Sequence, residues 1–304
     1  MAFDSLVRNG VKNRIATIGS MLRQTVFDWI DDKAPQLGAA LAFYTALSIA
    51  PLLVISLGIA ALVFGQEAAR GGVQEQMQFL VGDQGAKAVE EMIANANNTG
   101  KGVIATGLSV VILLVGASGV FGQLQQSLNE IWKVQPKAGR GIVDMIRDRF
   151  LSFVMVLGTA FLLLVSLLLS AALSSLESVT NGLPESMLWI SRFAHAGVSF
   201  VVITLLFAMM YKYLPDAKIA WRDVWLGAAI TALLFTIGKF AIGLYLGHSS
   251  MASSYGVAGS FVVLLVWVYY SAQILFLGAE FTQVHASRRG RRIVAAENAE
   301  PTGK

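Results

Sequence analysis

The sequence contains no cysteine and few charged residues. Of its 304 residues, 23 are Lys or Arg and 19 are Asp or Glu, so 14% are charged, against about 25% in ordinary soluble domains. Without cysteine the chain forms no disulfide, no thiolate metal site and no Cys nucleophile. Hydrophobic residues make up 55% of the chain, which is more apolar surface than one soluble core would bury. The composition therefore favours a protein that is solvated largely by lipid.

Histidine is also scarce, and this limits the enzymatic chemistry that the chain can support. The sequence has three histidines, and none of them occurs in a His-x-His or His-Glu-x-x-His arrangement, which metal-dependent hydrolases use to hold their ions. A Gly-x-Ser-x-Gly elbow and a Walker loop are also absent from the sequence. We therefore expect no enzymatic activity on soluble substrates, and no metal or cofactor.

Six long runs with few or no charged residues predict the fold. A bilayer core of about 30 Å requires about 20 apolar residues of helix, because each backbone polar group must be paired within the span. The expected spans are residues 37–64, 103–124, 150–176, 188–211, 224–246 and 257–281. We therefore predict an all-α polytopic membrane protein, with six transmembrane helices in one domain that covers residues 37–281.

The basic residues alternate between the two sides of this expected bundle. Eighteen Lys and Arg lie in residues 1–36, 125–149, 212–223 and 282–304, and three lie in the remaining connections. Because positive residues near span ends are retained in the cytoplasm, both termini are predicted to be cytoplasmic, with the protein in the plasma membrane. The basic charge follows the topology, so we expect membrane lipids and no nucleic acid as partners.

Three segments outside the spans carry their own patterns. Residues 1–36 lack the features of a cleaved signal peptide, and their apolar residues recur at helical spacing: Val11, Ile15, Ile18, Leu22, Val26 and Trp29. We expect an amphipathic cytoplasmic helix that lies either on the inner leaflet or on the ends of the spans. Residues 65–102 predict two short amphipathic outer helices. The basic tail, residues 282–304, is expected to be disordered.

Four stretches of the sequence resemble a known family. They are GAALAFYTALSIAPLLVI (38–55), SLNEIWKV (127–134), YLPDAKIAWRDVWLGA (213–228) and YGVAGSFVVLLVWVYYSAQILFLGAEFTQVHA (255–286). Their order and spacing are similar to those of the YihY/BrkB family of bacterial inner-membrane proteins, formerly mislabelled ribonuclease BN. The resemblance implies six helices and a bacterial inner-membrane location, and transport of lipids or small solutes has been proposed for relatives. The biochemical activity of the family is not implied by these motifs.

Polar residues and a proline within the spans are candidates for a functional role. Pro51 removes an amide donor in the middle of the first span and predicts a kink, which serves either packing or a gate hinge. Ser48 is expected to pair with the carbonyl group that the kink frees, at Leu47. Tyr44 and Gln273 are predicted to join helices or to contact substrate, together with Tyr269 and Tyr270.

Small residues are dense in three of the expected spans. The second span contains Gly116, Ser118, Gly119 and Gly122, the fifth contains Gly243 and Gly247, and the sixth opens with Gly256, Ala258, Gly259 and Ser260. Small residues allow helices to approach closely, and Gly243 and Gly247 have the spacing of a dimer motif. We expect packing within one chain, with a homodimer as the alternative.

Charged residues inside the spans suggest two sites. Lys239, Arg192 and His195 are predicted at similar depth in the outer half of the bundle, where they form a cationic site for a phosphate or carboxylate. The alternative is that Lys239 extends to the interface and Arg192 anchors there. Glu280 lies near the cytoplasmic end of the last span, as a coupling carboxylate for protons or ions, or as an interface residue paired with an arginine.

These features together favour a transporter or lipid translocator for an anionic or amphipathic solute, such as an anionic lipid. The alternative is a membrane scaffold for envelope assembly that moves no solute.

Overall fold

The computed structural model describes residues 2–48, 87, 119–137, 185–248, 259–291 and 293–302 of the chain. Side chains are described within residues 16–48, 87, 119–137, 196–245, 261–291 and 293–302. The labelled helices are α1 (Ala2–Asp31), α6 (Glu185–Tyr213), α7 (Trp221–His248) and α9 (Gly259–Arg288), and further helices cover residues 34–48 and 119–131. The strands are β1 (Val134–Pro136), β2 (Ala217–Lys218), β3 (Val294–Ala295) and β4 (Ala299–Pro301). Pro51, the expected outer helices and most of the first three expected spans lie outside the described residues.

Three of the described helices are long and apolar enough to cross a membrane. The qualifying segments are Ala196–Tyr213 in α6, Trp221–Tyr245 in α7 and Phe261–Arg288 in α9. They coincide with the fourth, fifth and sixth expected spans, although α9 continues beyond residue 281 to Arg288. The mostly helical membrane architecture is thereby confirmed, and the full set of six spans stays a prediction.

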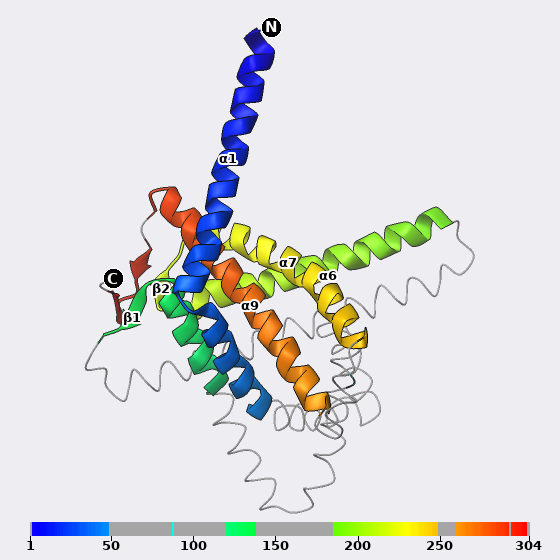
Figure 1. Ribbon diagram of the computed structural model, residues 1–304, viewed down its shortest axis with the longest axis vertical. Helices are drawn as coiled ribbons and strands as arrows, with labels where there is room; N and C mark the ends of the chain where they lie inside the picture. Colours follow the sequence, from blue (N-terminus) through cyan, green and yellow to red (C-terminus); the bar gives the residue numbers. More distant parts are fainter. Residues whose placement is uncertain are drawn as a thin grey trace, which may run out of the picture.

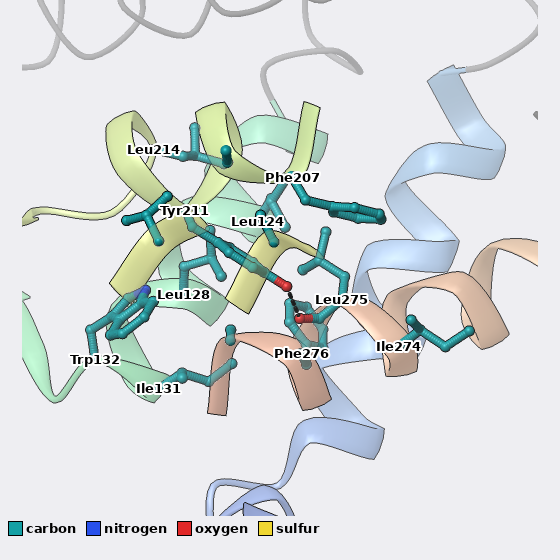
Figure 2. Packing of buried hydrophobic residues seen from close by; sticks show 14 of the residues in the cluster. Leu124, Leu128, Ile131, Trp132, Phe207, Tyr211, Leu214, Ile274, Leu275 and Phe276 are labelled. Atoms are coloured by element: carbon teal, nitrogen blue, oxygen red, sulfur yellow. Dashed lines mark hydrogen bonds between the residues drawn. The ribbon is translucent and has the colours of Figure 1, made fainter. Parts of the chain in front are cut away.

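The helices pack around α9 and α7. Helix α7 lies between α6 and α9, and α1 packs along α9 (Figure 1). The largest fully buried side chains include Trp132, Tyr211 and Phe276. Figure 2 shows how they bring helix 119–131, α6 and α9 into one apolar cluster. Burial of such aromatic side chains contributes roughly 1.5–3 kcal/mol each where water is excluded, so the cluster fixes how these three helices meet.

The last described residues are structured, contrary to our expectation of a disordered tail. Residues 293–302, here called the C-terminal strap, form β3 and β4, which pair antiparallel with β2 and β1. The amide of Ala296 also donates to the carbonyl of Asp216 at 2.8 Å, and the amide of Thr302 donates to the carbonyl of Lys133 at 2.9 Å. The prediction failed because it considered only the charge of the tail, whereas its backbone is held by partners distant in sequence.

Helix α1 is present where the sequence predicted a helix, and three residues of its apolar stripe are exposed, whereas Trp29 packs against the core. Ile18 is 54% exposed, Leu22 51% and Val26 47%. The first half of α1 projects beyond the other helices (Figure 1). Whether lipid covers this surface stays a prediction.

Candidate functional site

Helix α9 carries three polar residues on the side that meets the N-terminal helices. Gln273, Glu280 and Arg288 follow one another at spacings of seven and eight residues, so they lie on one side of a helix with 3.6 residues per turn. Arg288 donates to the side chains of Ser20 and Gln24 of α1, at 2.7 and 2.8 Å. This side of α9 is called the N-terminal seam below.

Glu280 is the most unusual residue of the seam. Its exposed fraction is 0%, and neither carboxyl oxygen has a hydrogen-bond partner among the described residues. Its carboxyl group lies beside that of Asp32, in the turn that follows α1, and the charge of Lys133 is also close. A buried carboxylate without hydrogen bonds or a cation of its own is strongly disfavoured. The predicted pairing of Glu280 with an arginine is therefore not seen in the described part of the chain.

Asp32 and Lys133 complete this cluster. The ammonium group of Lys133 donates to Oδ1 of Asp32, and Oδ2 of Asp32 is buried without a partner in the same described region. The side chain of Asp32 is 7% exposed and that of Lys133 41%, so the cluster reaches the surface through the lysine. One turn before Asp32, burial raises the pKa of the Asp28 carboxyl, an effect that a hydrogen bond to Gln24 opposes and the Asp32 charge increases.

Two similar turns position the ion pair. Lys33 follows α1 and Lys133 follows helix 119–131, and both have a φ of 56°. The amide of Lys33 donates to the carbonyl of Ile30 at 3.0 Å, and that of Lys133 to the carbonyl of Glu130 at 3.1 Å. A left-handed residue is a common helix ending, and it costs about 1–2 kcal/mol for a residue with a Cβ. The fold bears this cost at both ends of the Asp32–Lys133 pair.

Gln273 lies further along the same seam, against the helix of residues 34–48. Its amide nitrogen and oxygen are buried and have no hydrogen-bond partner within the described ranges. A side chain at Gly38 would collide with this amide, so Gly38 makes room for Gln273. The predicted role of Gln273 as a polar residue inside the bundle agrees with this placement, while its contact with substrate stays a prediction.

The opposite side of α9 meets α7 and α6 in a close contact where the hydroxyl groups of Tyr211, Thr231 and Thr282 are hydrogen-bonded. Nε1 of Trp267 and Nε2 of His285, on the same side, have no hydrogen-bond partner among the described residues. Tyr211 donates to the carbonyl of Leu275 at 2.7 Å (Figure 2), and its oxygen lies 2.9 Å from that of Thr231. A side chain at Gly278 would collide with Thr231, and one at Gly227 would collide with Thr282. Neither glycine belongs to a Gly-x-x-x-Gly motif, so the sequence pattern did not single them out.

The small residues expected to allow close helix packing make few close contacts in the described part of the chain. A Cβ at Gly119 would lie 2.8 Å from the ring of Tyr44, whereas one at Gly122 or Gly243 would meet nothing within 4 Å. Tyr44 is 39% exposed. Ser48 donates to the carbonyl of Tyr44 at 2.7 Å, so its expected bond to the carbonyl of Leu47 was wrong.

A second polar cluster ties the connections together at the end of the bundle where the strands lie. The side-chain amide of Asn129 donates to Oδ2 of Asp216 at 2.9 Å, and its oxygen accepts a hydrogen bond from the backbone N–H of Asp216 at 2.8 Å. Arg291 donates to both carboxylate oxygens of Asp223 at 3.0 Å. Beside Asp216 lies an open hollow of about 380 Å³, lined mainly by residues 122–136. Because these groups are paired, we assign this cluster to structure.

The structure describes only part of the predicted cationic site. Lys239 on α7 is partly buried, with its ammonium group 5.7 Å from the centre of the Phe240 ring. Arg192 and His195 belong to the first turns of α6, and their side chains lie outside the described residues. In Figure 1 these turns run away from the end of α7. The convergence of the three cations stays a prediction.

Long apolar helices packed side by side, with charged and hydrogen-bonded connections gathered at one end, define a polytopic helical membrane protein. The family model described as Virulence factor BrkB matches residues 26–302. The chain belongs to this family. The match includes the C-terminal strap and the turn that carries Asp32.

Curated relatives agree with this assignment. A UPF0761 membrane protein of Verminephrobacter eiseniae (strain EF01-2) is 30% identical over 80% of this chain and 57% of its own length. Those of Alkalilimnicola ehrlichii and Pseudoalteromonas translucida are 28% and 26% identical, over 97% and 87% of this chain and 66% and 88% of their own lengths. The chain thus spans between about half and two thirds of the length of several relatives. No solved structure gives a significant match.

Proposed function

We propose that the protein is a transporter or lipid translocator for an anionic or amphipathic solute in the bacterial inner membrane. The observation that supports this is the N-terminal seam of α9, where Gln273 and Glu280 hold buried polar atoms without partners among the described residues. Inside a membrane such groups cost free energy, and they are retained where ions, protons or solutes pass. In the contact of α9 with α6 and α7, by comparison, the hydroxyl groups of Tyr211, Thr231 and Thr282 are all hydrogen-bonded.

The test is reconstitution of the full chain into liposomes that carry a fluorescent anionic phospholipid. Saturable movement of the label between leaflets, lower in Gln273→Leu, is the expected result. The predicted cationic site is tested with the double variant Lys239→Met, Arg192→Gln, which should lose movement of the anionic lipid. Lys218→Met removes an exposed lysine outside the spans and serves as the matched control. Unchanged movement in the double variant would eliminate the cationic site.

The same proposal includes the orientation of the protein, with both termini in the cytoplasm. Reporters that are active only in the periplasm should be active when fused after residues 90, 182 or 252. They should be inactive after residues 135, 217 or 290, because the flanking connections are basic. Two reversed signals would contradict the six-span topology.

The exposed apolar residues of α1 favour a second candidate function, a membrane scaffold for envelope assembly. Such a scaffold would use α1 and the connections to hold partners and would move no solute. Liposomes that contain the folded chain but show no movement of any lipid or solute tested would favour this alternative over transport.

A further inference from the structure

The charges around Glu280 do not balance if every acidic residue is ionised. The charged groups that face Glu280 are Asp28 and Asp32, at the end of α1, and Lys133, after helix 119–131. Lys133 already forms an ion pair with Asp32. An ionised Glu280, which is 0% exposed, would therefore lie beside the negative charge of Asp32. It would also have to share the charge of Lys133 with Asp32. Two carboxyl groups in one site do not both ionise readily, since each disfavours the charge of the other.

The hydrogen bonds of the site also lack donors in the described part of the chain. Oδ2 of Asp32 and both oxygens of Glu280 are buried acceptors without a donor in the described part of the chain. A carboxylic acid has one O–H group that donates, while its other oxygen still accepts. One proton on Glu280 would donate to Oδ2 of Asp32, which removes the like-charge repulsion and gives Oδ2 of Asp32 a donor.

We propose that Asp32 and Glu280 form a proton-binding pair that holds one shared proton at neutral pH, with Lys133 as its counter-charge. On binding, one proton from water joins the pair, the O–H of Glu280 donates to Asp32, and the net charge of the three groups changes from −1 to 0. On release, the proton returns to water on the side where Lys133 reaches the surface. A proton fits this site better than a metal cation, because the ammonium group of Lys133 already occupies one oxygen of Asp32.

This inference deepens the proposed function, because a bound proton would couple solute movement to a pH gradient. Its test needs no transported solute. Infrared spectroscopy of the full chain in liposomes detects the C=O stretching band of a protonated carboxyl group, which shifts in D₂O. The expected result at pH 7 is a band present in the wild type and absent in Glu280→Gln.

Two further variants separate a shared proton from other origins of the band. Asp32→Asn should also lose the band at pH 7. The new amide would donate to Glu280, and Lys133 would be free to pair with Glu280, so that Glu280 ionises. Glu297→Gln, which changes a glutamate whose side chain is 95% exposed, should keep the band. A band that survives in Glu280→Gln, or that persists in Asp32→Asn, would overturn the proposal.

Lys133→Gln tests the pair without altering a buried side chain. Because a nearby cation stabilises ionised carboxylates, its loss should make the band persist to a pH about one unit higher or more. No shift, or a shift to lower pH, would contradict the role of Lys133. Size-exclusion profiles and thermal unfolding curves show that each variant is folded. If the infrared band behaves as expected but the chain moves no solute in liposomes, the transport proposal is refuted and the proton-binding pair is not.

Discussion

The two sides of α9 use polar residues in opposite ways. Toward α7 and α6, Tyr211 and Thr231 reach partners, and Gly227 and Gly278 let the helices approach closely. Toward α1 and helix 34–48, Gln273 and Glu280 bury polar atoms that no described residue pairs. The paired hydroxyl groups of the first side stabilise the fold, whereas burial of the unpaired groups of Gln273 and Glu280 on the second costs free energy. Polar residues inside a membrane bundle are therefore informative when they lack partners.

The largest expected effect breaks the paired side. Gly278→Val should remove most of the folded protein from membranes, because its Cβ would collide with Thr231 and lie 2.7 Å from the Tyr211 oxygen. Overpacking of this kind costs about 1–3 kcal/mol, and more where backbones meet. The measurement is the yield of monodisperse protein after detergent extraction. Gly243→Val is the matched control, since no atom of the described residues lies within 4 Å of a Cβ at that position. Equal yields for the two variants would contradict close packing at Gly278.

A smaller effect is expected when one hydrogen-bonding group is removed from the paired side. Tyr211→Phe deletes the hydroxyl that bonds the Leu275 carbonyl, which should lower the free energy of unfolding by about 1–2 kcal/mol. Thermal unfolding in detergent measures the change. Tyr213→Phe alters a tyrosine that is 56% exposed and should leave the unfolding curve in place; an equal loss in both variants would show that the bond contributes nothing specific.

A still smaller effect is expected at the exposed end of the N-terminal seam. Arg288→Gln removes bonds to Ser20 and Gln24 that lie in solvent, so the free energy of unfolding should fall by about 0.5–1 kcal/mol. Hydrogen exchange of α1 is the sensitive measurement, because only this contact is weakened. Arg289→Gln alters an exposed neighbour whose side chain makes no hydrogen bond to α1 within the described residues. Faster exchange of α1 in Arg289→Gln as well would contradict the assignment.

The smallest effect on stability is expected where the seam lacks partners. Gln273→Leu should leave the free energy of unfolding unchanged or raise it by up to about 1 kcal/mol, because an unpaired buried amide is replaced by an apolar group. The unfolding temperature should change in the same direction. Lipid movement in liposomes should nevertheless fall. Gln283→Leu, on the same helix, is the matched control for both measurements. A clear loss of stability in Gln273→Leu alone would mean that the amide has a structural partner.

Much of the described fold could be predicted from hydropathy. The helices α6, α7 and α9 were found because bilayer thickness sets the length of an apolar run. Glu280 was found because an acid stands out in such a run, but Asp32 and Lys133 were missed, since each belongs to a distant segment that looks like an ordinary charged connection. Strands of two or three residues carry no periodic signal, so the C-terminal strap was also missed. Isolated glycines such as Gly278 gain their meaning only from the side chain opposite.

The contact between α1 and α9 orders events during synthesis. A ribosome produces α1 long before it produces α9, so the contact between the two helices forms only after the helices between them have been made. The proton-binding pair that we infer consists of Asp32, which follows α1, and Glu280, which lies in α9. The site therefore forms only at the last step of assembly, when the C-terminal strap is also added. A chain cut short before α9 would lack Glu280 and therefore the pair altogether.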